Sequence, residues 1–124
     1  MITTEIAKTV LLEPFKSGCD ELCILTAYAT PQMASWLLNE FAGSKGVSAK
    51  VTLLVGMPLF DGISKSAHEG FKGLHTHQYS RPNIQFFCGY ICEGMPVHMN
   101  LYIWQKNGVP VSAFVGSAEF LQGT

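Results

Sequence analysis

The chain has 124 residues, of which 48% are hydrophobic, and its mean hydropathy is +0.22. This length and composition predict one domain over residues 1–124 with ample material for a core. The longest apolar runs have only the length of a strand, which excludes a membrane-spanning helix. The first residues lack the basic and then apolar pattern of a signal peptide. The sequence therefore predicts a cytoplasmic protein with no membrane partner.

The net charge of the chain is −1, with seven lysines and Arg81 as the single arginine. Proteins that bind nucleic acids usually carry a basic surface, because contacts to phosphate supply much of the affinity. No basic cluster is visible in this sequence. We therefore expect this segment to bind DNA only weakly by itself.

Helices and strands alternate along the first three quarters of the chain. Thr4 to about Glu13 is expected to form a helix that Pro14 ends or kinks. Thr30 and Pro31 have the residue types of a helix N-cap and first helical position. The other predicted elements are a buried strand over 21–28, a helix ending at Gly43, a strand over 49–56, a helix over 63–79 and a strand over 84–89.

Strands that alternate with helices and read as unbroken apolar runs predict an α/β fold. We expect a mixed, largely parallel sheet with helices on both faces, to which a C-terminal hairpin adds antiparallel strands. Ligands of such sheets bind beyond the carboxyl ends of the strands. The loops over 28–30 and 57–62 are therefore expected to line a pocket.

The hairpin prediction depends on the pair Asn107–Gly108. A two-residue type I′ turn requires positive φ at both positions, and this pair is the strongest short-range signal for one. The flanking strands are expected over 97–104 and 111–119. With the turn at this place, Asn100 is expected opposite Val115.

The same pairing places His98 opposite Ser117. Because side chains alternate between the faces of a strand, His98, Asn100, Ser117 and Glu119 are then expected to share one face. Directly paired Cβ atoms lie about 5 Å apart. Four polar side chains would thus converge on one patch of an otherwise apolar ribbon.

Two aromatic side chains and two histidines have simpler interpretations. Tyr102 and Trp104 continue the face of His98, and we expect them to pack in the core or along a dimer seam. His75 and His77 diverge on a helix because they are two residues apart. They are expected at a solvated helix end.

Four cysteines occur as two pairs with a spacing found in zinc sites, namely Cys19 with Cys23 and Cys88 with Cys92. Cys23 and Cys88 lie in strand-like runs, where a free cysteine behaves as a small buried hydrophobe. A cytosolic protein also disfavours disulfides. We favour free thiols and no metal or cofactor, and a four-cysteine zinc site is the alternative.

The residues of the hairpin resemble the phospholipase D superfamily, in which His-x-Lys on one strand is followed by Gly-Ser-x-Asn on the next. The segments 25–30, 53–57 and 113–118 are similar to the restriction-endonuclease branch of that superfamily. This likeness runs from about residue 20 to the end of the chain. Asn100 stands where the family has lysine, and Glu119 stands where it has asparagine.

The resemblance implies a phospholipase D-like half fold that hydrolyses DNA phosphodiester bonds without a metal ion. It implies that His98 attacks phosphorus to form a phosphohistidine, while Ser117 and the positions of Asn100 and Glu119 bind the phosphate. The chain holds one copy of the motif, so a working site requires a homodimer with two His98 side chains facing each other. Enzymes of this branch carry a recognition domain downstream, which is consistent with a fragment of a longer restriction enzyme.

Two other functions stay open at this point. Asn100 brings no positive charge and Glu119 adds a negative one, which favours a catalytically inactive dimeric scaffold for protein interactions. A third possibility is another phosphodiester substrate, such as a phospholipid head group, because the motif recognises phosphate.

Overall fold

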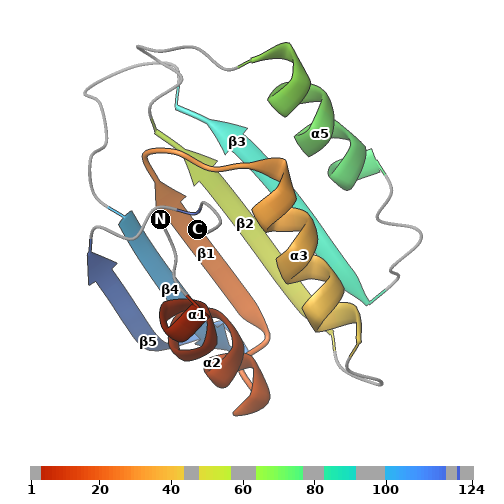
Figure 1. The fold of residues 1–124 in the computed structure, drawn as a ribbon. Coiled ribbons are helices and arrows are strands. Elements are labelled where there is room, and N and C mark those ends of the chain that lie inside the picture. The colour runs from red at the N-terminus through yellow and green to blue at the C-terminus, as the bar shows by residue number, and fades with distance from the viewer. Residues whose placement is uncertain are drawn as a thin grey trace.

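A mixed five-stranded sheet with helices forms the fold, in the strand order β3-β2-β1-β4-β5 (Figure 1). This is a computed structural model. It describes residues 4–43, 48–56, 64–76, 83–91, 100–116 and 120. The α/β class and the mixed sheet that the sequence predicts are confirmed.

The parallel part of the sheet is built from alternating strands and helices. In chain order they are β1 (Glu21–Thr26), α3 (Pro31–Ala42), β2 (Ala49–Val55), α5 (Lys65–Thr76) and β3 (Ile84–Tyr90). β1 pairs in parallel with β2, and β2 pairs in parallel with β3. Each of these elements is predicted by the sequence, although β1 ends two residues earlier than expected.

Both crossover helices begin at a hydroxyl side chain. The Met33 N–H donates to Thr30 Oγ1 at 3.3 Å, and Pro31 occupies the first helical position as predicted. The Ala67 N–H donates to Ser64 Oγ at 3.1 Å at the start of α5. These bonds satisfy backbone donors that the first turn of a helix leaves without a partner.

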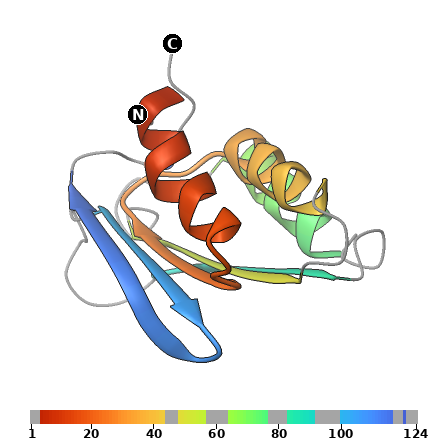
Figure 2. The same cartoon turned by 90° about the horizontal axis from the view of Figure 1, so that it is seen from below.

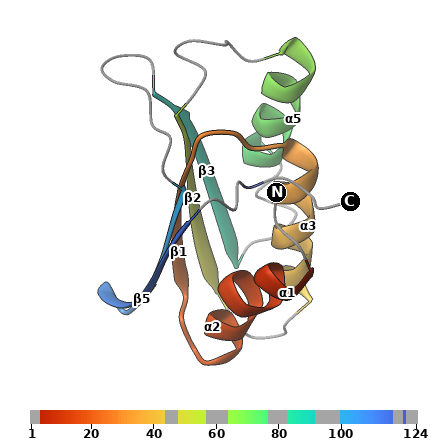
Figure 3. The same ribbon diagram turned by 60° about the vertical axis from the view of Figure 1, so that its left-hand side comes forward.

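All described helices lie on one face of the sheet (Figures 2 and 3). This corrects the expectation of helices on both faces. The physical reason is the strand order, because β1, β2 and β3 follow one another across the sheet in one direction. Two successive crossovers of the same hand then place their helices on the same side.

The opposite face of the sheet is apolar but only partly covered among the described residues. Burial alternates along β1 and β2, with Leu22, Ile24, Val51 and Leu53 buried beneath the helices. The alternate positions Cys23, Leu25, Thr52 and Leu54 are half-buried. The unbroken apolar runs in the sequence therefore reflect two apolar faces, of which the described helices cover one.

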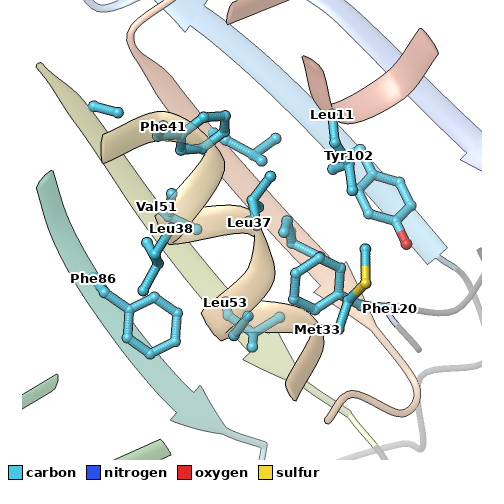
Figure 4. Packing of buried hydrophobic residues seen from close by; sticks show 14 of the residues in the cluster. Leu11, Met33, Leu37, Leu38, Phe41, Val51, Leu53, Phe86, Tyr102 and Phe120 are labelled. Carbon is cyan, nitrogen blue, oxygen red and sulfur yellow. The ribbon is translucent and has the colours of Figure 1, made fainter. Parts of the chain in front are cut away.

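One cluster of buried side chains joins the helices to the sheet. In Figure 4, Leu37 of α3, Val51 of β2 and Phe86 of β3 lie in the layer between them. The ring of Phe41 packs against Phe15 and Trp104, with centroids 4.3 and 5.8 Å apart. Leu37 and Phe41 of α3 are thus both part of the core.

The N-terminal helix continues through Pro14. Its three consecutive segments are α1 (Thr4–Ile6), the π-helical η1 (Ala7–Leu12) and α2 (Glu13–Lys16). Pro14 has no N–H to offer the carbonyl of Val10, four residues earlier. The indole Nε1–H of Trp104 donates to that carbonyl instead, at 2.6 Å. A side chain from the sheet thus satisfies the acceptor that proline leaves open, and the helix does not end there.

The C-terminal hairpin consists of β4 (Asn100–Lys106) and β5 (Val109–Gly116), and β4 pairs antiparallel with β1. At the turn, φ is 53° for Asn107 and 79° for Gly108. Both values lie in the left-handed region that a type I′ turn requires. The predicted turn is confirmed.

The pairing of the two hairpin strands shifts by one residue near the turn. Gln105 lies opposite Pro110 as predicted, but Trp104 lies opposite Ser112, so Val111 has no partner on β4. Pro110 cannot donate to the ladder, and β5 is an edge strand, where such irregularities are tolerated.

The shift makes the predicted register wrong beyond the turn. Asn100 lies opposite Gly116 and not Val115. The predicted pairing of His98 with Ser117 depends on the same register, and both residues lie outside the described part of the chain.

Candidate functional site

The sequence predicts four site residues, and the structure describes one of them. Asn100 is the first residue of β4 and is 3% exposed. His98, Ser117 and Glu119 lie outside the described residues, as does the predicted loop over 57–62. The described part of the candidate site is therefore the sheet edge around Asn100.

The side chain of Asn100 joins the ends of three strands. Its Oδ1 accepts from Thr26 Oγ1 at 2.7 Å and from the Ala27 N–H at 3.2 Å. Its Nδ2 donates to the Gly116 carbonyl at 3.3 Å. The Ala27 N–H can only donate, which fixes the orientation of the amide. Asn100 thus holds the last residues of β1 and β5 to the first residue of β4.

Thr26 connects this network to the chain beyond β5. Its hydroxyl accepts from the Phe120 N–H at 3.3 Å, and the Phe120 carbonyl accepts from the Thr30 N–H at 3.3 Å. Phe120 also forms an isolated parallel bridge with Ala29, and its side chain is fully buried. Gly116 and Phe120, on either side of residues 117–119, are therefore both bonded to the Thr26–Asn100 pair.

Thr26 belongs to the site, although the sequence does not single it out. The residue ends a strand that is otherwise largely apolar, and it is 0% exposed. A buried hydroxyl needs a hydrogen-bond partner. A threonine at the end of an apolar strand is therefore the signal in the sequence that a polar partner lies nearby. Ala29 and Thr30 both bond to Phe120 at this edge, and a pocket lined by the loop over 28–30 stays a prediction.

This edge is where the fold favours ligand binding. It lies at the carboxyl ends of the parallel strands, the usual ligand side of open α/β sheets. The groups that the structure describes there are neutral: an amide, a hydroxyl and backbone N–H and C=O groups. They can donate and accept hydrogen bonds, but they bring no positive charge to an anion.

The comparison with protein families matches residues 4–124 to the NgoFVII restriction endonuclease N-terminal PLD domain. The chain belongs to this family. The match covers nearly the whole chain and confirms the resemblance to the restriction-endonuclease branch. A comparison with curated proteins found no match.

The aromatic residues of β4 in this PLD domain belong to the core. Tyr102 is 2% exposed and Trp104 is fully buried. Both side chains therefore pack in the core, which is one of the two predicted roles, the other being a dimer seam. His75 lies near the end of α5, where its Nδ1 bonds the Phe86 carbonyl at 3.0 Å. A carbonyl only accepts, so Nδ1 carries a proton. His77 lies outside the described residues.

The described cysteines of the PLD domain are free thiols in different environments. Cys88 shares its face with the buried Leu53, whereas Cys23 shares the opposite face with Thr52. Cys23 and Cys88 therefore cannot bind one ion together. Burial raises the pKa of Cys88 from 9.0 to about 12. Burial, and then the charge of Glu21, raise the pKa of Cys23.

The described residues contain no group of three histidine, cysteine or acidic side chains placed to hold a metal ion. None of the helices in the described ranges is long and apolar enough to cross a membrane.

Proposed function

We propose that this PLD domain hydrolyses phosphodiester bonds of DNA without a metal ion, as a homodimer in which two copies of His98 face one phosphate. The observation that carries the proposal is the family match over residues 4–124. The Thr26–Asn100 network supports it, because it lies at the ligand side of the sheet. His98 precedes Asn100 by two residues, and Ser117 follows Gly116 directly.

The proposed reaction has two steps. The imidazole of one His98 attacks phosphorus, a P–N bond forms, and the P–O bond to the leaving group breaks. The second His98 gives its proton to the leaving oxygen. Water then attacks phosphorus, passes a proton to the second His98, and the P–N bond breaks. Ser117 donates a hydrogen bond to a phosphoryl oxygen throughout.

The two departures from the family pattern set the expected rate. Asn100 holds Thr26 and Gly116 in place and offers a phosphate one uncharged amide proton, and Glu119 occupies the other phosphate-binding position. Each change makes a half-site more negative by one unit. Loss of one preorganised donor typically costs about 3–4 kcal/mol, or 10²–10³ in rate. We therefore propose a nuclease that is slow compared with one that has lysine and asparagine at these positions.

The decisive experiment is nicking of supercoiled DNA in the presence of EDTA. Wild-type protein is expected to nick the DNA slowly, His98→Ala is expected to be inactive, and His77→Ala serves as the matched histidine control. Equal rates for wild type and His98→Ala would remove the catalytic proposal. Complete inhibition by EDTA would remove the metal-free mechanism alone.

The hydrogen bonds of Asn100 favour a second function, that of an inactive dimeric scaffold. Three hydrogen bonds within the protein occupy its amide. Under this proposal wild type does not nick DNA, and the double variant Asn100→Lys, Glu119→Asn gains phosphate binding. Titration of the His98 NMR resonance of wild type by a phosphodiester would contradict the scaffold. Thermal unfolding of the double variant shows whether it retains the fold.

A further inference from the structure

Tyr28 is an exposed aromatic residue beside the Thr26–Asn100 network, and the proposed reaction does not use it. It lies between β1 and α3, where the chain leaves the carboxyl end of β1 (Figure 1). Tyr28 is 39% exposed, whereas Ala27 before it is 4% exposed and Ala29 after it is half-buried. Part of this residue is therefore accessible to a ligand at the sheet edge.

Hydrogen bonds hold the backbone on both sides of Tyr28. Its own carbonyl accepts from Thr26 Oγ1 at 3.0 Å. After it, Ala29 forms the parallel bridge with Phe120, and the Thr30 N–H donates to the Phe120 carbonyl. A side chain on a fixed backbone loses little conformational freedom when it binds a ligand, and a tyrosine has only two torsions to fix. Tyr28 is thus well placed to contact a ligand at low entropic cost.

One hydroxyl group connects Tyr28 to the predicted phosphate site. Thr26 Oγ1 lies 3.0 Å from the Tyr28 carbonyl oxygen and 2.7 Å from Asn100 Oδ1. His98 is two residues before Asn100, and two residues of chain span at most about 7 Å. Tyr28 and the proposed nucleophile therefore belong to the same edge of the sheet.

The described part of this edge offers DNA little electrostatic attraction. Its groups are neutral, and the net charge of the chain is −1. Bases stack on aromatic rings without regard to charge, and such stacking supplies affinity for single strands. Of the exposed large hydrophobic residues in the described ranges, two have rings, namely Tyr28 and Phe87. Phe87 is in register with Thr52, within the sheet and on the face away from the helices. Tyr28 is thus the exposed ring at the edge.

Stacking on Tyr28 restricts the form of the DNA. A base within a duplex is covered on both faces by its neighbours. Proteins that contact the face of a base therefore act on single strands or turn the base out of the stack. A stacking contact at Tyr28 favours an unpaired strand over a duplex.

We propose that the ring of Tyr28 stacks on one unpaired base next to the phosphate that this domain cleaves, and that single-stranded or locally opened DNA is the preferred substrate. This inference rests on the proposed function, because it takes DNA as the ligand. It assigns a role to the ring and none to the hydroxyl group of Tyr28.

The test is binding of a fluorescent oligothymidylate to the His98→Ala protein, measured by anisotropy beside an abasic strand of the same length. Loss of one stacked base is expected to cost about tenfold in affinity. Tyr28→Ala should therefore bind oligothymidylate about tenfold more weakly and the abasic strand as before. The ratio of single-strand to duplex affinity should fall by the same factor. The slope of log K against log salt should not change, because stacking releases no counterions.

Two control variants separate the ring from other effects. Tyr28→Phe keeps the ring and should bind like the parent protein. Phe87→Ala removes the other exposed ring, at a place away from the edge, and should also bind like the parent. Weaker binding by Phe87→Ala equal to that of Tyr28→Ala would show a general loss of apolar surface and would overturn the inference.

The remaining outcomes distinguish this inference from the proposed function. Equal binding by Tyr28→Ala and the parent would overturn the inference, as would no binding by the parent. A parallel loss of oligothymidylate and abasic binding would also overturn it, because Tyr28 would then support the edge and not the base. Nicking by wild type would stand through each of these results. No nicking by wild type, with Tyr28-dependent binding intact, would remove the catalytic proposal and leave the stacking site in place.

Discussion

At the scale of single residues, Asn100 has a structural role that its place in the predicted motif does not indicate. It satisfies the Ala27 N–H, the Thr26 hydroxyl and the Gly116 carbonyl at once. A buried donor or acceptor left without a partner costs about 1–3 kcal/mol. The strength of the network therefore depends on an amide at this position, whether or not the domain cleaves DNA.

We predict that Asn100→Ala lowers the free energy of unfolding by about 2 kcal/mol, because it leaves the buried Ala27 N–H without its acceptor and the Thr26 hydroxyl with only the Tyr28 carbonyl. Urea denaturation measures this change. Gln105→Ala on the same strand is the control, and it should stay within about 0.5 kcal/mol of wild type. Equal stability of the two variants would show that the Asn100 network contributes nothing to folding.

Cys88 carries a pH dependence of stability. Burial raises its pKa to about 12 in the folded protein. Because the thiol has a higher pKa in the folded protein than in the unfolded chain, its contribution to stability is fully present below pH 9. This contribution is lost as the pH rises from 9 toward 12. The loss is at most about 1.4 kcal/mol per pH unit, and less because the thiol is partly exposed.

Cys88→Ala is therefore predicted to lose less stability than wild type between pH 8.5 and about 11. Urea midpoints at several pH values measure the difference. The phenol of Tyr90, whose pKa burial and the charge of Cys88 also raise, titrates in both proteins. Parallel curves for the two proteins would contradict the assignment to Cys88.

At the scale of elements, the packing of α5 on α3 depends on a glycine. A Cβ atom at Gly70 would lie 2.7 Å from the Cβ and Cγ atoms of Pro31. The ring of proline cannot rotate away, so the two helices can approach this closely only with glycine at that position. The cost of a glycine inside α5 is offset by this approach.

The matched pair Gly70→Ala and Gly73→Ala tests this contact. Alanine in a helix interior is usually favoured over glycine by about 0.5–1 kcal/mol, and a Cβ at Gly73 would meet nothing within 4 Å. We predict that Gly73→Ala raises the thermal midpoint. Gly70→Ala is expected to lower the thermal midpoint, because overpacking costs about 1–3 kcal/mol. The same sign for both variants would contradict the close approach.

The elements themselves were largely predictable from local chemistry. Thr30 and Pro31 start α3, and Asn107 and Gly108 form the hairpin turn, because each of these residue types satisfies a local backbone requirement. The register beyond the turn was not predictable, since the shift at Val111 depends on how β5 pairs with β4. The same holds for Pro14, whose helix persists because the distant Trp104 supplies a donor.

At the scale of the whole molecule, the order of the strands determines which face of the sheet the described helices cover. The apolar runs of β1 and β2 predict a buried parallel sheet, but they do not reveal the order of the strands. Because β1, β2 and β3 advance in one direction, the described helices share one face. The family was predictable from the hairpin motif and its flanking segments. The hydrogen bonds of Asn100 were not predictable, because its partners Thr26 and Ala27 lie more than seventy residues away in sequence.

The last prediction concerns the proposed dimer. If each active site needs the His98 side chains of two copies, a heterodimer of wild type and His98→Ala has one and is inactive. After exchange of equal amounts, about a quarter of the dimers are wild type on both sides. Nicking per total protein is then expected to fall to a quarter of the wild-type value. Copies that act independently would retain half of the wild-type nicking. The measured fraction therefore distinguishes a site shared by two copies from a site within one copy, and no cleavage rate has to be known in advance.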